Sequence, residues 1–511
     1  MSVGTLVTSR SYLSKQLTGI HKALTEKSTQ LSTGKVSTTY GGVGDNRLLD
    51  LQLTQKIGQI DSYQETITRA NLHLKTLNLT LERLEGLRLD AKSAYDANDF
   101  ELEADGQTQT QSTAELLLYE TANLLNTEVA GYYLFGGTDT TNNPVAEVDA
   151  IMNGAGGLDG FRTVSDEYVQ ANLGVNNNGR LDISALTTNY VGLIPTDSTF
   201  TIAEDGAHDF GFDISSVTSG LSNTNIIGPG GGDPDSFDVT LTGQPTQGET
   251  ISIEFTLPPD HTDTYTLELT AADGQAGENE FLIGADLEET AQNLRDAISS
   301  ALQEEAQTNL KAIANQWAAD EFFDTYAGGV TMRIDGPPYD TATGLVDGSA
   351  TTVAWYTGEN SATTDPREDK RAVIDTNLTL NYGARANEQG IADLMKSLAT
   401  FVAADFSGGT TADEQYYNTL AQNMRTVVSP DADSQSGISN ISTDIAIAYR
   451  TLEMTEARHT QMRSSFLTTV GEIEGVDNDT LAMEILQLQT NLETSYRASS
   501  IVFQLSLVNY I

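Results

Sequence analysis

The chain has 511 residues, of which 38% are apolar and 19% charged, proportions that suit about three or four globular domains and not a disordered chain. Its 72 acidic and 27 basic side chains give a formal net charge of −45, which disfavours nucleic acid and anionic lipid as partners. There is no cysteine, so the sequence excludes disulfides, thiol nucleophiles and cysteine-ligated metals.

Targeting to a membrane is not indicated by the sequence. The first ten residues, from Met1 to Arg10, contain no basic region followed by an apolar one, so we expect no cleaved secretory signal peptide. No stretch of about 18 apolar residues occurs, so we expect no segment that spans a membrane.

The first predicted helix carries an apolar stripe and ends at Gly34. Apolar residues in this helix alternate at spacings of three and four, which is typical of a helix that packs on other helices. A break is then predicted at Gly41, Gly42 and Gly44. The stripe consists of Leu6, Leu13, Leu17, Ile20, Leu24 and Leu31.

A second, longer helix is predicted from about Asn46 to about Ala97. Between Ile60 and Leu84 its apolar residues follow the same alternation. Such a helix would be roughly 75 Å long, a length that is uncommon outside a bundle or coiled coil. A third helix is predicted over about 107–130, ending at Gly131.

The middle of the chain is acidic and is predicted to be rich in strands, with no lysine or arginine between Arg180 and Arg295. Apolar and polar residues alternate in three segments, which predicts strands over 237–241, 251–257 and 265–269. One amphipathic helix is predicted from about Leu287 to Trp317, and further strands are predicted near 330–335 and 351–356.

The C-terminal part mirrors the first. A helix with the same alternation is predicted from Ile441 to Ile473, and the residues from Asp477 to Thr480 offer N-cap side chains for a final helix that runs to Ile511. The stripe of this last helix consists of Leu481, Ile485, Leu488, Leu492, Ile501, Leu505 and Val508.

Together these elements predict an α+β multidomain protein. Residues 1–45 and 475–511 would form a terminal helical pair, and residues 46–138 and 368–474 a bundle of long helices. The two parts would build a coiled-coil-like helical bundle. Residues 139–367 would be inserted as an acidic, β-rich α+β region of one or two subdomains.

The terminal helices need partners to bury their stripes. The first 35 residues carry five basic side chains and one acid, and residues 475–511 carry four acids and one arginine, so opposite charge favours their pairing. Exposed ion pairs add at most about 1 kcal/mol each, whereas a well-buried leucine adds roughly 1.5–3 kcal/mol. The stripes exceed what one partner helix can cover, which predicts contacts with further subunits. By pattern alone, a closed bundle within one chain is an equally good alternative.

Both ends also carry motifs. The run Leu24–Val36, with a leucine heptad that ends in Leu-Ser-Thr-Gly, and the run Leu488–Ser500 together resemble the opening and closing helices of the flagellin superfamily. Gly131–Thr138 and the ending Leu505–Ile511 resemble one branch of that superfamily, the hook-associated protein 3 family of hook–filament junction proteins. The chain departs from the family after its first helix, where Gly41–Asn46 replaces an Asp-Asp-Pro or Asp-Asp-Ala element.

The resemblance implies an extracellular protein of the bacterial flagellum that leaves the cell unfolded through the type III export apparatus, with an export chaperone. It implies that the paired terminal helices line the inner tube of the axial structure, that the long helices form the next shell, and that the insertion faces the medium. The implied partners are further copies in a ring and other axial proteins, namely a hook-associated protein and flagellin. Neither nucleic acid nor a membrane is an expected partner.

The sequence shows no catalytic constellation, so we expect no enzyme, no cofactor and no metal site. The five histidines, at 21, 73, 208, 261 and 459, do not pair at metal-ligand spacing, and His459 is predicted to be a core or interface histidine. Asp431–Gly437 resembles an EF-hand loop only superficially, because its glycine is misplaced and the closing glutamate is missing. Gly228–Asp235 is predicted to be a turn.

The predicted function is therefore structural and serves motility: a secreted, self-assembling subunit that joins the hook to the filament. Two alternatives stay open. One is a filament flagellin with a similar C-terminus, and the other is an extracellular adhesin or cation-binding module whose acidic insertion is the active part.

Overall fold

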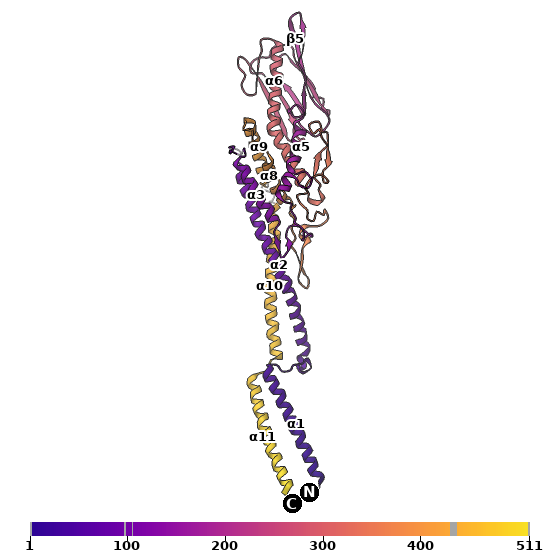
Figure 1. The fold of residues 1–511 in the computed structure, drawn as a ribbon, viewed down its shortest axis with the longest axis vertical. Coiled ribbons are helices and arrows are strands. Elements are labelled where there is room, and N and C mark those ends of the chain that lie inside the picture. Colours follow the sequence, from indigo (N-terminus) through magenta and orange to yellow (C-terminus); the bar gives the residue numbers. More distant parts are fainter. Residues whose placement is uncertain (1–2, 97–98, 105, 430–436, 509–511) are drawn as a thin grey trace. The chain divides into compact units, whose positions relative to one another are not determined.

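The computed structural model describes residues 3–96, 99–104, 106–429 and 437–508, with the side chains of 3–10, 502–503 and 505–508 left out of the description. The chain is α+β and forms two compact units (Figure 1). Unit 1 comprises Met1–Asn71, Ala372–Leu380 and Tyr449–Ile511, and unit 2 comprises Leu72–Arg371 and Asn381–Ala448. These two units reflect contacts within a single chain and not within an assembly. They therefore do not test the predicted three-part division, which stays a prediction.

Unit 1 is built from helices at the two ends of the chain. It contains α1 (Val3–Thr33) and α11 (Asn478–Val508), together with the first half of α2 (Arg47–Ala94) and the second half of α10 (Gly437–Glu474). The bounds of α2 and α10 confirm the two long helices that the apolar spacing predicted.

The helix ends in unit 1 follow from local side-chain and backbone chemistry. Helix α1 stops where Gly34 adopts a φ of 68°, a conformation that favours glycine, and the Gly34 N–H donates to the Gln30 carbonyl at 2.8 Å. Helix α11 begins after Asp477, whose Oδ1 accepts from the Asp479 N–H at 3.0 Å. The predicted break contains two short 3₁₀ turns, η1 (Tyr40–Gly42) and η2 (Gly44–Asn46).

Unit 2 contains a group of packed helices. They are α3 (Gln109–Leu125), α4 (Val148–Asn153), α5 (Phe161–Leu173), α8 (Gln389–Ala403) and α9 (Thr411–Val427), and the longest helical segment consists of α6 (Leu287–Glu305), a π-helical turn (Ala306–Leu310) and α7 (Lys311–Phe323). This segment confirms the amphipathic helix predicted from Leu287 and extends it past Trp317. Helices α4 and α5 were not predicted, so the expectation of one helix in the middle region was wrong.

Two larger antiparallel sheets complete unit 2, except that β10 and β11 pair in parallel. One sheet has the order β11-β10-β9-β6, and the other has the order β3-β5-β8-β7 with β4 also on β5. The three predicted strands are confirmed as β8 (Ser236–Leu241), β9 (Thr250–Thr256) and β10 (Thr264–Ala272). The other strands of these sheets are β3 (Leu181–Ile183), β4 (Thr187–Val191), β5 (Ile194–Glu204), β6 (Asp213–Ser219), β7 (Thr224–Ile227) and β11 (Glu280–Leu282).

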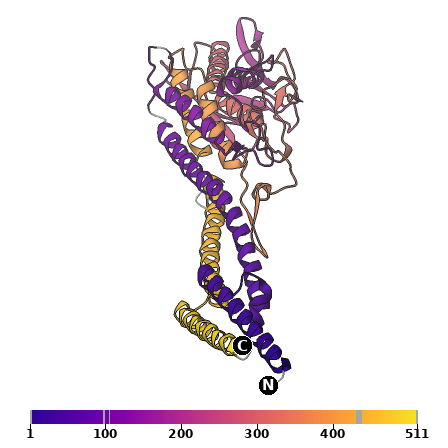
Figure 2. The same cartoon turned by 60° about the horizontal axis from the view of Figure 1, so that its bottom comes forward.

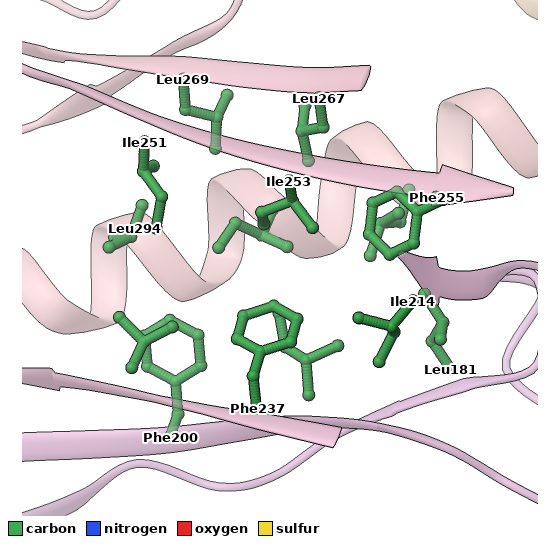
Figure 3. Close-up of a cluster of buried hydrophobic side chains, with 14 of the residues drawn as sticks. Leu181, Phe200, Ile214, Phe237, Ile251, Ile253, Phe255, Leu267, Leu269 and Leu294 are labelled. Carbon is green, nitrogen blue, oxygen red and sulfur yellow. The ribbon is translucent and has the colours of Figure 1, made fainter. Parts of the chain in front are cut away.

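Both sheets and helix α6 share one apolar core. Figure 3 shows side chains of β9 and β10, such as Ile253 and Leu267, pointing toward Phe237 of the other sheet and toward Leu294 of α6. The strands alternate buried and partly exposed residues, as in β9, where Ile251, Ile253 and Phe255 are buried. The period-two pattern in the sequence therefore marks the faces that meet in this core.

Several short strand pairs lie outside the larger sheets. They are β1 (Glu128–Val129) with β2 (Tyr132–Tyr133), β12 (Met332–Ile334) with β13 (Leu345–Asp347), and β14 (Arg371–Asp375) with β15 (Leu378–Asn381). Strand β12 confirms the strand expected near 330–335.

The strand predicted near 351–356 is wrong. Thr352 and Tyr356 make only isolated bridges, to Asp159 and Val145. Trp355 is buried against the ring of Phe323, and its Nε1 donates to the Phe323 carbonyl at 3.0 Å. The alternation of apolar residues in this segment thus reflects packing on helix α7 and not on a sheet.

Within the described residues, no helix combines the length and the apolar character needed to cross a bilayer.

A candidate assembly surface on the terminal helices

The two terminal helices lie side by side and run antiparallel, with the two chain ends at the same end of the pair (Figures 1 and 2). Near the middle of α1, His21 Nε2 is 2.7 Å from the Tyr496 hydroxyl, and further along the helix Lys27 Nζ is 2.6 Å from Glu484 Oε2. Higher numbers in α1 therefore meet lower numbers in α11. The basic N-terminal segment and the acidic C-terminal segment contact each other through these groups.

A short backbone junction joins the ends of the pair. The Val36 N–H donates to the Glu474 carbonyl at 2.7 Å, and the Val476 N–H donates to the Gly34 carbonyl at 3.2 Å. The side chain of Lys35 adds an ion pair with Glu474 at 2.6 Å, and this carboxylate raises the pKa of the Lys35 ammonium. The segment that connects α1 to α2 and the segment that connects α10 to α11 are thus bonded to each other.

The predicted packing residues all belong to this pair, but the pair leaves their stripes largely uncovered. In α1, Leu13, Leu17, Ile20 and Leu24 are half-buried and Leu31 is exposed, so none of the α1 side chains that the structure describes is buried. In α11, Leu481 is buried, with 4% of its surface exposed, while Ile485, Leu488 and Leu492 are half-buried and Ile501 is exposed. The side chains of Leu6, Leu505 and Val508 lie outside the described residues.

Exposed apolar residues outside the stripes were missed by the sequence interpretation. Met483 and Leu486 of α11 are more than 60% exposed, at 64% and 62%, and Tyr12 of α1 is also exposed. These residues do not follow the main stripe, and their only signal in the sequence is the three-residue spacing between Met483 and Leu486. These exposed residues and the half-buried stripe are the apolar side chains that the helix pair leaves accessible, and we call the whole set the terminal-helix surface.

The neighbouring helix pair within unit 1 is covered much better. Ile60 and Ile67 of α2 and Leu452 of α10 are buried, and so is His459, which stacks on the Tyr63 ring at 5.8 Å. The prediction that His459 is a core or interface histidine is therefore confirmed.

Polar contacts surround this buried row. Asp375, in the β14–β15 hairpin, lies 3.4 Å from His459 Nε2 and 2.5 Å from an Arg458 nitrogen, and Arg463 Nε donates to Asp61 at 2.6 Å. The contrast with the terminal pair shows that an antiparallel helix pair in this chain can bury a seam when further elements cover it.

One buried carboxylate marks the beginning of α2. The Asp50 side chain is fully buried, and neither of its oxygens has a hydrogen-bond partner among the described residues. Burial raises the pKa of Asp50, and the nearby Glu474 raises it further, whereas Lys35 lowers it. This group lies beside the junction that connects the terminal pair to the long helices, so its protonation bears on the stability of unit 1.

The loops considered for cation binding are explained by other chemistry or lie outside the structure. Asp235 accepts hydrogen bonds from the Gly230, Gly231 and Gly232 N–H groups at 3.0, 2.6 and 3.1 Å, which lowers the pKa of its carboxyl group and confirms the predicted turn. The segment Asp431–Gly437 falls almost wholly in residues 430–436, outside the described residues. In the described ranges, no three His, Cys, Asp or Glu side chains group as metal ligands would.

The remaining histidines of unit 2 contact single acids or none. His208 Nε2 lies 2.7 Å from Asp205, and His261 Nδ1 lies 3.1 Å from Asp213. Burial lowers the pKa of His73, whose Nδ1 has no partner in the part of the chain that is described.

A scan against protein-family models finds no match for the chain, and a search of curated proteins finds no significant match either.

Proposed function

We propose that this chain is a structural, non-enzymatic subunit of the bacterial flagellum that assembles by its terminal helices at the junction between hook and filament. The observation that carries the proposal is the terminal-helix surface. A helix of 31 residues with an apolar stripe has no buried side chain among those described, although α11 lies along it.

The half-buried and exposed apolar side chains of α1 and α11 favour contact with a partner. Soluble monomers expose single apolar residues routinely, but contiguous apolar patches mark interaction sites. In the proposed assembly, α1–α11 pairs of neighbouring copies pack into a coiled-coil-like helical bundle, and each pair covers the stripe that its own chain leaves open. Copies arranged in this way form a ring if the rotation that relates one copy to the next returns to its start after a whole number of copies.

The motifs at both ends support the same proposal. The opening run that ends at Gly34, the closing run Leu488–Ser500 and the final Leu505–Ile511 resemble the flagellin superfamily and its hook-associated branch. The proposed partners are further copies in a ring, a hook-associated protein, flagellin, and the type III export apparatus with its chaperone. Export in an unfolded state suits terminal helices that gain much of their stability only from neighbours.

The proposal is tested by binding to isolated flagellar hooks. Purified full-length protein is mixed with hooks, the hooks are pelleted, and the bound protein is located by immunogold labelling. We expect labelling at hook ends only and no self-assembly in the absence of hooks. Long filaments from the protein alone would refute the junction role and favour a filament flagellin.

A cellular experiment separates the same two roles. Cells that lack the gene should keep their hooks and shed their filaments if the chain is a junction subunit. Cells that lack a filament flagellin should instead keep an intact junction. Loss of neither hooks nor filaments would exclude both roles and favour an adhesin.

A further inference from the structure

An exposed apolar tip projects from the β-rich part of unit 2. Strands β4 and β5 form a hairpin whose end carries Tyr190, Val191, Leu193 and Ile194, which are 50%, 71%, 96% and 70% exposed. Four large apolar residues within five positions go beyond the single exposed residues that are normal for a soluble surface. We call residues 190–194 the β4–β5 tip.

The tip is apolar on both faces and at its apex. Val191 pairs with Ile194 across the hairpin, so these side chains share one face, and Tyr190 pairs with Pro195 on the other. Gly192 has a φ of 71°, which fits the first position of a tight two-residue turn, and Leu193 occupies the second position. Turn positions of this kind usually hold polar residues, so a leucine flanked by valine and isoleucine is a departure from ordinary turn chemistry.

The hairpin extends beyond the sheet that supports it (Figure 1). Strand β8 pairs with β5 only from Ser198 to Ala203, which leaves the part of the hairpin near the tip as a two-stranded ribbon. Asn189 Nδ2 donates to Asp197 Oδ1 at 2.7 Å across the ribbon, and the Tyr190 hydroxyl donates to Glu288 at the start of α6. The ribbon is therefore held in place by polar contacts while its end stays in solvent.

The polarity of the ribbon changes in layers along its length. From the apex toward the base, the ribbon carries first the aliphatic Val191, Leu193 and Ile194. Next comes Tyr190, whose hydroxyl group is bound to a carboxylate, and then come the amide group of Asn189 and the charged group of Asp197. This order from aliphatic to aromatic to polar is that of side chains at a membrane interface. Two to three residues of strand span about 7–10 Å, which matches the roughly 5–10 Å depth that interfacial segments reach.

The surrounding charge decides among the partners that could enclose the tip. No lysine or arginine occurs between Arg180 and Arg295, and Asp197 and Glu288 lie at the base of the ribbon, so a second copy of the same region or an anionic lipid surface would be repelled. A flat protein surface would cover only one face of the ribbon. A fluid, uncharged hydrocarbon layer covers both faces and the apex at once.

We propose that the β4–β5 tip inserts into the outer part of a zwitterionic lipid layer and anchors unit 2 there without crossing it. This inference is independent of the proposed flagellar function. The expectation that the chain has no membrane partner rested on repulsion from anionic lipid and on the lack of a spanning segment. The proposal limits that expectation to anionic lipid and to segments that span a membrane. Neither argument applies to shallow insertion into neutral lipid.

The test is flotation of the full-length protein with phosphatidylcholine vesicles over a series of lipid concentrations. We expect the protein to float with the vesicles, and we expect Leu193→Asp to lower the apparent lipid affinity by about ten- to hundredfold. Leu116→Asp is the matched control, because Leu116 is an exposed leucine on helix α3 of the same unit. This control should bind like the wild-type protein.

Lipid charge provides a further arm of the test. Phosphatidylserine in the vesicles should weaken binding at low salt, and added salt should restore it. Wild-type protein that does not float with phosphatidylcholine would overturn the proposal and leave an apolar socket on another protein as the partner of the tip. Equal loss of binding by the Leu193 and Leu116 variants would also overturn it. Hook binding by the Leu193→Asp protein should be unchanged. Failure of the lipid-insertion proposal can therefore be told apart from failure of the proposed flagellar role.

Discussion

Two leucines five residues apart on helix α11 separate folding of the chain from its assembly. Leu481 is 4% exposed and Leu486 is 62% exposed. Leu481→Ala removes a buried side chain and should lower the free energy of unfolding of unit 1 by about 2–4 kcal/mol. Leu486→Ala removes a side chain that the chain itself does not cover, so unit 1 should lose less than about 0.5 kcal/mol.

The order should reverse when assembly is measured. A whole leucine side chain contributes roughly 1.5–3 kcal/mol when it is buried, so the exposed 62% of Leu486 corresponds to about 1–2 kcal/mol that becomes available in the assembly. This energy corresponds to a factor of about 5–30 in the protein concentration that half-saturates isolated hooks.

Two spectroscopic signals separate the units in the stability assay. Both tryptophans, Trp317 and Trp355, lie in unit 2, so loss of helical circular dichroism without a change in tryptophan fluorescence reports unfolding of unit 1. Hook pelleting gives the assembly constant for the same samples. The reasoning is refuted if Leu486→Ala destabilises unit 1 as strongly as Leu481→Ala, or if Leu486→Ala binds hooks with unchanged affinity.

Three further changes test other parts of the structure. Burial raises the pKa of Asp50 above its unfolded value, so protonated Asp50 favours folding at low pH, and this contribution is lost as pH rises through the folded pKa. Asp50→Asn should therefore stabilise unit 1 by about 1–3 kcal/mol at neutral pH and by nothing near about pH 3 in circular dichroism melts, with the exposed Asp45→Asn as the matched control. Removal of residues 478–511 should leave the tryptophan fluorescence transition of unit 2 in place and abolish hook binding; loss of the whole fold would instead favour a closed bundle. Arg333→Ala should lower the stability of unit 2 by about 3–5 kcal/mol, since it leaves the buried Glu167 carboxylate unpaired, while Arg371→Ala, at an exposed pair, should cost less than about 1 kcal/mol in the same fluorescence melt.

The elements at both ends of the chain could be predicted because their signals are local. The alternation of apolar residues predicted α2 and α10 to within a few residues, Gly34 predicted the end of α1, and the acids and amides from Asp477 to Thr480 predicted the start of α11. The same holds for strands β8, β9 and β10, where a period of two marks the faces that meet in the core (Figure 3).

The errors occurred where packing against distant residues replaced the local pattern. Residues 351–356 alternate like a strand, but Trp355 packs on Phe323, so no ladder forms. Helix α5 was missed although its side chains are buried, because they pack mainly against α7, which lies far away in the sequence. Asp50 gave no signal at all, since a single acid in a helix is ordinarily exposed.

The sequence by itself determined that both ends are amphipathic helices of opposite charge and that their stripes are wide. Only the tertiary structure decided which part of each stripe is covered: Leu481 is buried by its own chain, whereas Leu486 and every α1 side chain that the structure describes retain exposed surface. It also decided that the β4–β5 tip projects beyond its sheet. The physical reason is the same in both cases, because periodicity fixes which residues share a face, while the exposure of that face depends on segments that are distant in the sequence.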